Sequence, residues 1–300
     1  MKRVDGLLLL NKPAGMTSNR ALQTVRRLLR ARKAGHTGSL DPAATGMLPL
    51  CFGEATKVCG YLLDADKTYR VTAKLGTATT TGDADGEEIS TADVPSLDAD
   101  AWNELLQGFL GDSMQVPPMY SALKKDGKRL YELARKGETV AREPRPIRID
   151  EITLLEAAGT RLVFRVRCSK GTYVRSLVED LAKAAGTVAH TARLHREAVG
   201  SFDSEATLDL DEVERLAECG ELESRLLPPD VALVAMPGVE IDAAAAEKFC
   251  GGQAVEAAAD ADEGLARVYA GERDFLGVGE LTGDGWLAPR RVFNLPRKAL

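Results

Sequence analysis

Cysteine is scarce in this 300-residue chain: there are five, an odd number, and no two form a Cys-x-x-Cys pair. This pattern argues against a disulfide framework and against a structural zinc site, so we expect the thiols to be reduced. No apolar run is long enough to span a bilayer, and the leucines after Lys2 and Arg3 are too few for a signal peptide. The sequence therefore predicts a cytoplasmic protein without a membrane span.

Histidine is scarcer still. The chain has three, His36, His190 and His195, and the last two are five positions apart, so they do not share a helix face. A His-Glu-x-x-His motif, a Gly-x-x-x-x-Gly-Lys phosphate loop and a Gly-x-Gly-x-x-Gly fingerprint are all missing. The sequence therefore predicts neither a metal site nor a nucleotide cofactor.

Negative charge predominates, with a formal net charge of -6, but it is distributed unevenly. Residues 19–40 hold six Lys and Arg and no acid, and residues 124–148 hold nine against four acids. The acids collect in residues 203–230, within an expected polar helix. Because phosphates respond to local positive potential rather than to net charge, a nucleic acid is a candidate partner.

The most informative segment is 35–50, GHTGSLDPAATGMLPL, in which small residues surround one carboxylate, that of Asp41. Its glycines permit dihedrals closed to other residues and Pro42 fixes φ, so the segment predicts a loop of defined shape. A structural turn capped by Asp41 is an alternative of equal weight. A relay of Ser39, His36 and Asp41 is disfavoured, because such relays converge from distant parts of a fold. The chemical alternative is a lone aspartate that acts as nucleophile or base.

Hydrophobic periodicity predicts strands and helices without a regular βαβ rhythm. Strands are expected at residues 4–10, 67–75 and 162–168. Helices are expected from a cap at 17–19 to 32–33, and at 98–109, 128–136 and 172–185, with an exposed loop at 83–98. This order predicts an α+β fold with a large mixed, mainly antiparallel sheet and flanking helices.

The pattern changes at residues 227–230, LPPD, which resemble a linker. Beyond them we expect a short helix at 243–249 and two strands, 266–270 and 275–281, joined by a turn at Gly271. The sequence therefore predicts a first domain over residues 1–230 and a small β-rich domain over residues 231–300.

Several motifs together resemble the TruB family of tRNA pseudouridine-55 synthases, in the family's order and spacing. They are LNKPAGMTS at 10–18, the segment 35–57, DKTYR at 66–70, CSKGTYVRSL at 168–177, and AH at 189–190 followed by RL at 193–194. The resemblance implies a pseudouridine synthase fold and isomerisation of the T-loop uridine of tRNA (position 55). In that reaction the N1–C1′ bond is cut, the flipped-out uracil turns, and a C5–C1′ bond forms through a covalent aspartate intermediate.

The resemblance also implies roles for single residues. Asp41 is the catalytic nucleophile, which attacks either C1′ of the sugar or C6 of the base. The implied substrate-binding residues are His36, in the place of the departed base, Tyr69 and Tyr173 in the uracil pocket, Leu194 against the uridine, Arg175 beside Asp41, and Lys12 beneath the loop. No cofactor or metal is implied. By pattern alone, the two tyrosines and Leu194 are ordinary core residues.

The expected partner is the T stem-loop of tRNA, bound by a monomer that needs no protein partner. The resemblance places an RNA-clasping insertion at about residues 117–146. The alternative interpretation of the same residues is a surface helical hairpin. The C-terminal part resembles, more loosely, a PUA-like RNA-binding barrel. Two other functions are open: a non-catalytic RNA-binding or RNA-folding protein, which Asp41 disfavours, and a guide-RNA-dependent synthase, which the clasp insertion disfavours.

Overall fold

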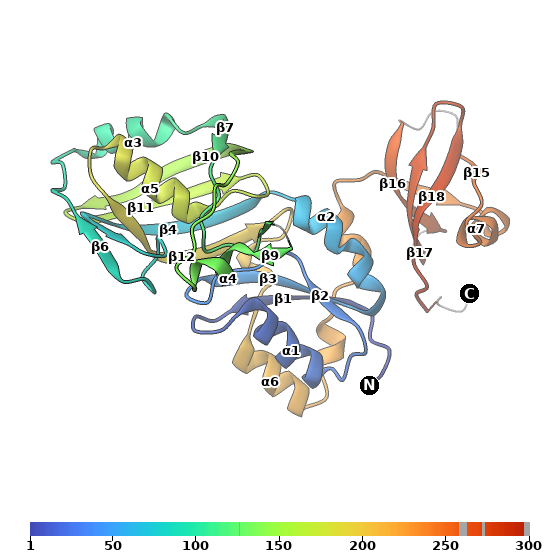
Figure 1. Cartoon of the computed structure of the whole chain (residues 1–300). Coiled ribbons are helices and arrows are strands. Elements are labelled where there is room, and N and C mark those ends of the chain that lie inside the picture. Colours follow the sequence, from blue (N-terminus) through green and yellow to red (C-terminus); the bar gives the residue numbers. More distant parts are fainter. Residues whose placement is uncertain (126, 258–262, 272–273, 297–300) are drawn as a thin grey trace.

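The structure is a computed structural model that describes residues 1–125, 127–257, 263–271 and 274–296. It consists of a large sheet flanked by helices and, towards the C-terminus, a smaller curled sheet with one helix (Figure 1). The helices are α1 (Ser18–Leu28), α2 (Cys59–Asp64), α3 (Ala99–Gln107), α4 (Leu130–Ala134), α5 (Val174–Ala184), α6 (Leu210–Glu218) and α7 (Ala243–Cys250).

The strands of the large sheet are β1 (Gly6–Lys12), β2 (Ala34–His36), β3 (Thr45–Phe52), β4 (Lys67–Leu75), β7 (Gly111–Gln115), β10 (Arg145–Ala158), β11 (Arg161–Cys168), β12 (Ala189–Val199) and β13 (Leu208–Asp209). Two small hairpins pair β5 (Thr77–Thr79) with β6 (Glu88–Thr91) and β8 (Lys124–Lys125) with β9 (Lys128–Arg129). The C-terminal sheet contains β14 (Gly238–Ile241), β15 (Val255–Glu256), β16 (Gly264–Ala270), β17 (Asp274–Leu281) and β18 (Trp286–Val292).

The large sheet has the order β13-β1-β3-β12-β4-β11-β10-β7, and β2 pairs with β3 outside this path. Its ladders are antiparallel except for two, β1 with β13 and β3 with β12. The predicted mixed, mainly antiparallel sheet is therefore confirmed. The parallel β3–β12 pair matters most for function, because it joins two segments that are far apart in the sequence.

Two pairs of helices cover the large sheet. Val25 of α1 and Val213 of α6 are buried in one core with β1 and β3. Trp102 of α3 and Leu177 of α5 are buried in a second core with β4, β10 and β11. Burying each such side chain contributes about 1.5–3 kcal/mol, so these apolar faces hold the layers together.

The first helix begins where the sequence predicts and ends earlier. The Thr17 hydroxyl accepts a hydrogen bond from the Arg20 backbone N–H, which caps α1. The helix ends at Leu28 rather than at 32–33, because Arg30 adopts a left-handed conformation with φ of 53°. The Arg30 N–H then bonds back to the Arg27 carbonyl, which closes the last turn.

Other boundaries also differ from the predictions. The helix expected at 128–136 is only α4, since residues 128–129 pair as β9. The loop expected at 83–98 contains the exposed strand β6, and the linker expected at 227–230 packs, since Leu227 pairs with Leu7 and Pro229 is buried. The strands expected at 67–75 and 162–168 are confirmed as β4 and β11.

The C-terminal sheet has the order β14-β16-β17-β18-β15, with α7 packed against it through Phe249. A further apolar cluster joins this sheet to the large one, where Phe275 and Phe293 pack with Leu62 of α2 and Leu233. In the described part of the chain, no helix is long and apolar enough to cross a membrane.

Candidate active site

Asp41 lies in the loop between β2 and β3, and segment 10–18 holds this loop on both sides of the aspartate. The Ser18 hydroxyl donates to the Leu40 carbonyl (3.1 Å) and accepts from the Leu40 N–H (2.8 Å). The Gly15 N–H donates to the Pro42 carbonyl (2.9 Å). The backbone that carries Asp41 is therefore fixed by contacts to a segment about 25 residues earlier in the chain.

Lys12 is fully buried beneath the same loop. Its ammonium donates to the carbonyls of Pro13 (2.8 Å), Met16 (2.9 Å) and Pro42 (3.3 Å). Burial lowers the pKa of Lys12 to about 8, although the nearby Asp41 carboxylate acts to raise it. Lys12 is placed to support the loop rather than to line the cleft that Asp41 faces.

Arg196 of β12 holds the loop from the other side and is 1% exposed. Its Nε donates to the Met47 carbonyl (2.7 Å) and its Nη2 to the Gly38 carbonyl (3.1 Å). Among the described residues, no carboxylate lies within ion-pair distance of its guanidinium. No sequence pattern indicated Arg196, because hydrogen bonds to backbone carbonyls leave no motif.

Gly46 explains how β12 comes so close to the loop. Its φ is 103°, and a Cβ at this position would lie 2.3 Å from the Arg196 backbone carbonyl oxygen. Only glycine therefore permits the parallel pairing of Gly46 with Arg196 that places β12 beside β3.

The structure brings most of the predicted site residues together around one cleft of about 300 Å³. The predicted residues that line it are Asp41, Tyr69, Tyr173, Arg175 and Leu194. They come from the β2–β3 loop, β4, the start of α5 and β12, which meet only in the folded chain. His36 and Lys12 are not among the lining residues. The other lining residues are Ser39, Leu40, Tyr120, Ser121, Ala122, Thr172 and Val174.

Arg175 links two carboxylates at the floor of this cleft. Its Nε lies 3.0 Å from Oδ2 of Asp41 and its Nη1 lies 3.7 Å from Oδ2 of Asp83. The same guanidinium donates to the carbonyls of Thr81 and Tyr120, both at 2.7 Å. Four partners fix a planar, buried group, so the orientation of the Asp41 carboxylate is fixed with it. Asp83 was not predicted from the sequence.

Opposing effects act on the charge of Asp41. Burial raises the pKa of its carboxyl group above the ordinary value, and Asp83 and Asp85 add to the rise, whereas Arg175 and Lys12 lower it. The side chain nevertheless keeps 42% of its surface accessible, on the side of the cleft. An ionisable carboxylate thus faces an opening while cations stand on its other sides.

The two tyrosines present rings to the cleft and are neutral phenols. Burial raises the pKa of both Tyr69 and Tyr173. The position of Tyr173 is fixed through its backbone, because its N–H donates to Oε1 of Gln115 (2.8 Å) and its carbonyl accepts from Nε2 of Gln115 (3.1 Å). Tyr173 is the N-cap of α5, not part of its first turn as the sequence predicted.

The histidines take no part in a relay or a metal site. The Nδ1 of His36 is buried and has no hydrogen-bond partner in the described structure, so Ser39, His36 and Asp41 do not form a hydrolytic triad. Burial lowers the pKa of His36, which keeps its ring neutral. His190 contacts the Thr77 carbonyl. Across the described residues, no three His, Cys, Asp or Glu side chains are grouped so as to hold a metal ion.

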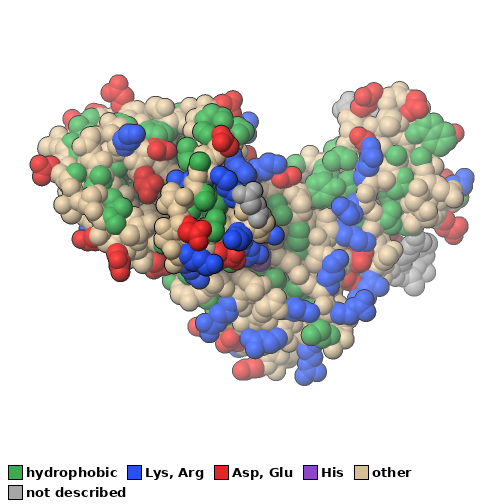
Figure 2. All heavy atoms as spheres, viewed as in Figure 1, with side chains coloured by type: hydrophobic (Ala, Val, Ile, Leu, Met, Phe, Trp, Pro, Cys, Tyr) green, Lys and Arg blue, Asp and Glu red, His purple; other side chains and the backbone are tan. Residues whose placement is uncertain are grey.

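Basic side chains surround the opening. Figure 2 shows Lys and Arg gathered over the region of α4 and β9 and again over the region of α1. We call residues 117–146 the clasp segment; it contains the β8–β9 hairpin and α4 and is not a helical hairpin. It contacts the cleft directly, through the Tyr120 carbonyl and Ser121.

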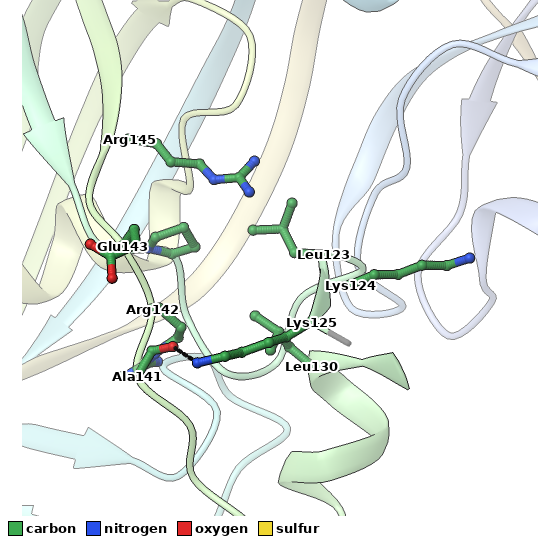
Figure 3. Close-up of a pocket in the computed structure, with 9 residues that line it drawn as sticks. Leu123, Lys124, Lys125, Leu130, Ala141, Arg142, Glu143 and Arg145 are labelled. Atoms are coloured by element: carbon green, nitrogen blue, oxygen red, sulfur yellow. Dashed lines mark hydrogen bonds between the residues drawn. The ribbon is translucent and has the colours of Figure 1, made fainter. Parts of the chain in front are cut away.

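The clasp segment encloses a second cavity, of about 260 Å³ (Figure 3). Leu123 and Leu130 form apolar walls, and the guanidinium of Arg145 points across the cavity toward Leu123 (Figure 3). The Lys125 ammonium donates to the Ala141 carbonyl (2.7 Å), which ties the hairpin to the returning chain. The clasp segment therefore presents cations on a partly apolar surface, which suits RNA.

Comparison with known families covers most of the chain. The model of the TruB family pseudouridylate synthase (N terminal domain) matches residues 26–174. The models of the tRNA pseudouridylate synthase B C-terminal domain and of pseudouridine synthase II TruB, C-terminal, match residues 175–234 and 237–293.

Individual proteins named tRNA pseudouridine synthase B are similar over nearly the full length. The protein from Dechloromonas aromatica is 51% identical, over 98% of this chain and 97% of its own. The protein from Pseudomonas putida (strain F1) is 50% identical over 98% and 97%, and that from Nitrosococcus oceani is 49% identical over 96% and 94%.

Solved structures share the fold. An H/ACA RNP bound to a substrate RNA containing 2′-deoxyuridine matches with a TM-score of 0.74 and 25% identity, covering 97% of this chain and 86% of that one. An archaeal box H/ACA sRNP Nop10–Cbf5 complex matches with a TM-score of 0.73, 25% identity and the same coverage. The sheet, the family models and the relatives agree: this chain belongs to the TruB family of pseudouridylate synthases, enzymes that convert uridine to pseudouridine.

Proposed function

We propose that this protein isomerises the T-loop uridine of tRNA to pseudouridine and that Asp41 is its nucleophile. The observation that carries the proposal is the Asp41–Arg175 pair, 3.0 Å apart, on the floor of a cleft lined by aromatic and apolar side chains. A carboxylate that is fixed, accessible and paired with one cation is suited to forming and breaking a covalent bond with a nucleoside.

The size of the cleft supports base flipping. A volume of about 300 Å³ takes one nucleoside and excludes a stacked or paired one. Unstacking the target base costs about a few kcal/mol, and contact with the rings of Tyr69 and Tyr173 offsets that cost. Leu194 closes the same wall.

The reaction then needs no group beyond those in the cleft. Asp41 attacks C1′ or C6, the N1–C1′ bond breaks and the uracil turns. C5 then bonds to C1′, the bond between Asp41 and the substrate breaks so that the carboxylate is regenerated, and the C5 proton leaves to solvent. Both sites of attack are compatible with the geometry. Arg175 and Lys12 keep Asp41 ionised, since both lower its pKa, while Asp83 orients Arg175.

The wider binding mode follows from the shape of the chain. We infer that residues 1–230 form the catalytic domain and residues 231–300 a PUA-like domain, and that the clasp segment holds the T stem-loop. His36, the last residue of β2 before the loop of Asp41, takes the place of the departed base. The protein acts as a stand-alone monomer in the cytoplasm, consistent with near full-length similarity to proteins named tRNA pseudouridine synthase B.

The test is tritium release from an unmodified tRNA transcript labelled at C5 of uridine. Asp41→Asn keeps the shape of the side chain and removes the nucleophile, so we expect tRNA affinity within about twofold of wild type and no release above background. The matched control is Asp112→Asn, an exposed aspartate on β7, which should release at the wild-type rate. Release by Asp41→Asn at the wild-type rate would refute the assignment.

A further inference from the structure

The six Lys and Arg side chains of residues 19–40 do not line the active-site cleft. After α1 the chain turns and exposes Arg30, Arg32 and Lys33 just before β2. Within the described residues, no carboxylate lies within ion-pair distance of any of these three side chains. Three neighbouring cations without acidic partners repel one another and attract an external anion.

Arg30 is held in a conformation that disfavours it. In the described residues it is the only non-glycine with positive φ, 53°, at the position after a helix where glycine is usual. Its carbonyl accepts from the Lys2 N–H (2.8 Å), so the turn itself is needed, but a glycine would make the turn without strain. A strained arginine where glycine fits better points to a use for its charge.

Two of these cations, Arg32 and Lys33, line a groove of about 400 Å³, which we call the N-terminal groove; its charged lining residues are Lys2, Arg3, Asp5, Arg32, Lys33 and Glu54. Both acids are already engaged. Asp5 pairs with Arg3 (2.7 Å) and accepts from the Glu54 N–H (2.7 Å). Glu54 pairs with Lys57 (2.5 Å).

The remaining charges of the groove are positive. Lys2 pairs with Glu223, outside the lining, which leaves Arg32 and Lys33 uncompensated on the groove wall. Asn294, from the segment after β18, closes the other side, since its N–H donates to Glu54 (2.7 Å). The groove is therefore a positive channel at the junction of the two sheets.

The groove lies within reach of the same RNA that fills the active site. Lys33 leads directly into β2, and β2 leads into the loop of Asp41. Arg32 and Asp41 are nine residues apart, so they are separated by at most about 30 Å. Figure 2 shows basic side chains over the region of α1 and over the clasp segment in one view, hence on one face.

We propose that the N-terminal groove binds the phosphodiester backbone of the substrate tRNA outside the T stem-loop, through Arg32 and Lys33 on its wall and through Arg30, which is exposed in the turn that precedes them. This inference rests on the proposed function, because it takes the substrate of the active site as its occupant. The groove holds a strand by charge and not by sequence, since phosphate contacts position an RNA without reading its bases.

The first test is the double variant Arg32→Ala/Lys33→Ala, assayed for binding to full-length tRNA transcript and to an isolated T stem-loop. Each lost phosphate contact lowers the slope of log K against log salt by about 0.7–0.9. We therefore expect affinity for full-length tRNA to fall about tenfold at 0.1 M salt and affinity for the stem-loop to stay within about twofold. The matched control, Lys74→Ala/Arg161→Ala, removes two exposed cations where β4 pairs with β11 and should change neither affinity.

The second test separates charge from folding. Arg30→Gly relieves the left-handed strain, so we expect Tm to rise by about 2 °C while affinity for full-length tRNA falls about fivefold. If Arg30 had only a structural role, Arg30→Gly would change Tm and tRNA affinity in the same direction or would leave the affinity unchanged.

Two outcomes overturn the proposal: full-length tRNA binds the double variant as tightly as wild type, or both RNAs lose affinity equally. Failure of the proposed function is distinguishable, because then wild type itself releases no tritium from the T stem-loop. If the proposal holds, the double variant releases tritium at the wild-type rate when a labelled T stem-loop is supplied at saturating concentration.

Discussion

The two sheets of this protein bury different kinds of side chain. The nine-stranded part buries four Lys and Arg side chains, Lys12, Lys67, Arg175 and Arg196. Among the described residues of the C-terminal sheet and α7, every buried side chain is apolar, as with Phe249, which is 0% exposed. One region carries buried charge and the other does not.

The difference shows where this protein buries charged groups, at a cost in folding free energy, to fix the shape of backbone segments. A buried cation without a carboxylate costs several kcal/mol unless carbonyls satisfy its donors. The donors of Lys12 are satisfied by carbonyls of segment 10–18 and of Pro42, and those of Arg196 by the carbonyls of Gly38 and Met47. Those of Lys67 are satisfied by carbonyls at the end of α2. The described part of the C-terminal sheet has no such groups, because packing alone is enough for a region without a reactive side chain.

Among the buried cations, the largest effect on activity should come from Arg175. Replacing it with Met removes the cation that orients Asp41, and we expect kcat to fall about 10³-fold in single-turnover tritium release. Arg167→Met, an exposed arginine of β11 paired with Glu151, is the control and should keep kcat within about twofold. A kcat for Arg175→Met near wild type would show that the buried charge has no catalytic part.

The opposite pattern, a loss of stability without a loss of activity, should follow from Phe249→Ala in α7, which packs against the C-terminal sheet. Truncating a fully buried phenylalanine leaves a cavity, and we expect the free energy of unfolding to fall by about 3–4 kcal/mol in denaturant titration. Because no charge near Asp41 changes, kcat on a T stem-loop should stay within about twofold while the protein is folded. A parallel loss of kcat would contradict the contrast between the two regions.

Arg196→Met should have an effect on activity between those of Arg175→Met and Phe249→Ala, together with a loss of stability. It leaves the Gly38 and Met47 carbonyls without their donor, so we expect the free energy of unfolding to fall by about 2–3 kcal/mol. The loop also loosens, and kcat should fall about tenfold with little change in KM. Arg165→Met, an exposed neighbour on β11, should change neither quantity. Loss of stability with normal kcat would limit Arg196 to a structural role.

The smallest effect concerns pH. Asp41 must be ionised to attack, so the rate should fall as pH falls through its pKa, which burial and Asp83 raise. Asp83→Asn removes one cause of the rise, so we expect the acid limb of the kcat profile to move to lower pH than in wild type. Asp112→Asn should leave it in place. A shift to higher pH would contradict this arrangement of charges around Asp41.

Local structure was predictable where its cause is local. The start of α1 follows from Thr17, whose hydroxyl caps the next N–H groups, and β4 follows from strict alternation. The end of α1 was not predictable, because Arg30 occupies a conformation that its residue type disfavours. The strand β6 was missed since its residues are all exposed and only pairing with β5 defines it.

The sequence by itself determined the family and the sheet type, and it singled out Asp41 as the candidate nucleophile. It did so because glycines, a proline and one carboxylate in a fixed order leave few structures open to that segment. Tertiary structure alone decided how Asp83 meets Arg175, how Arg196 meets the carbonyls of Gly38 and Met47, and how the N-terminal groove forms. These residues are far apart in the chain, and their contacts are to backbone carbonyls or across strands, where no residue pattern records them.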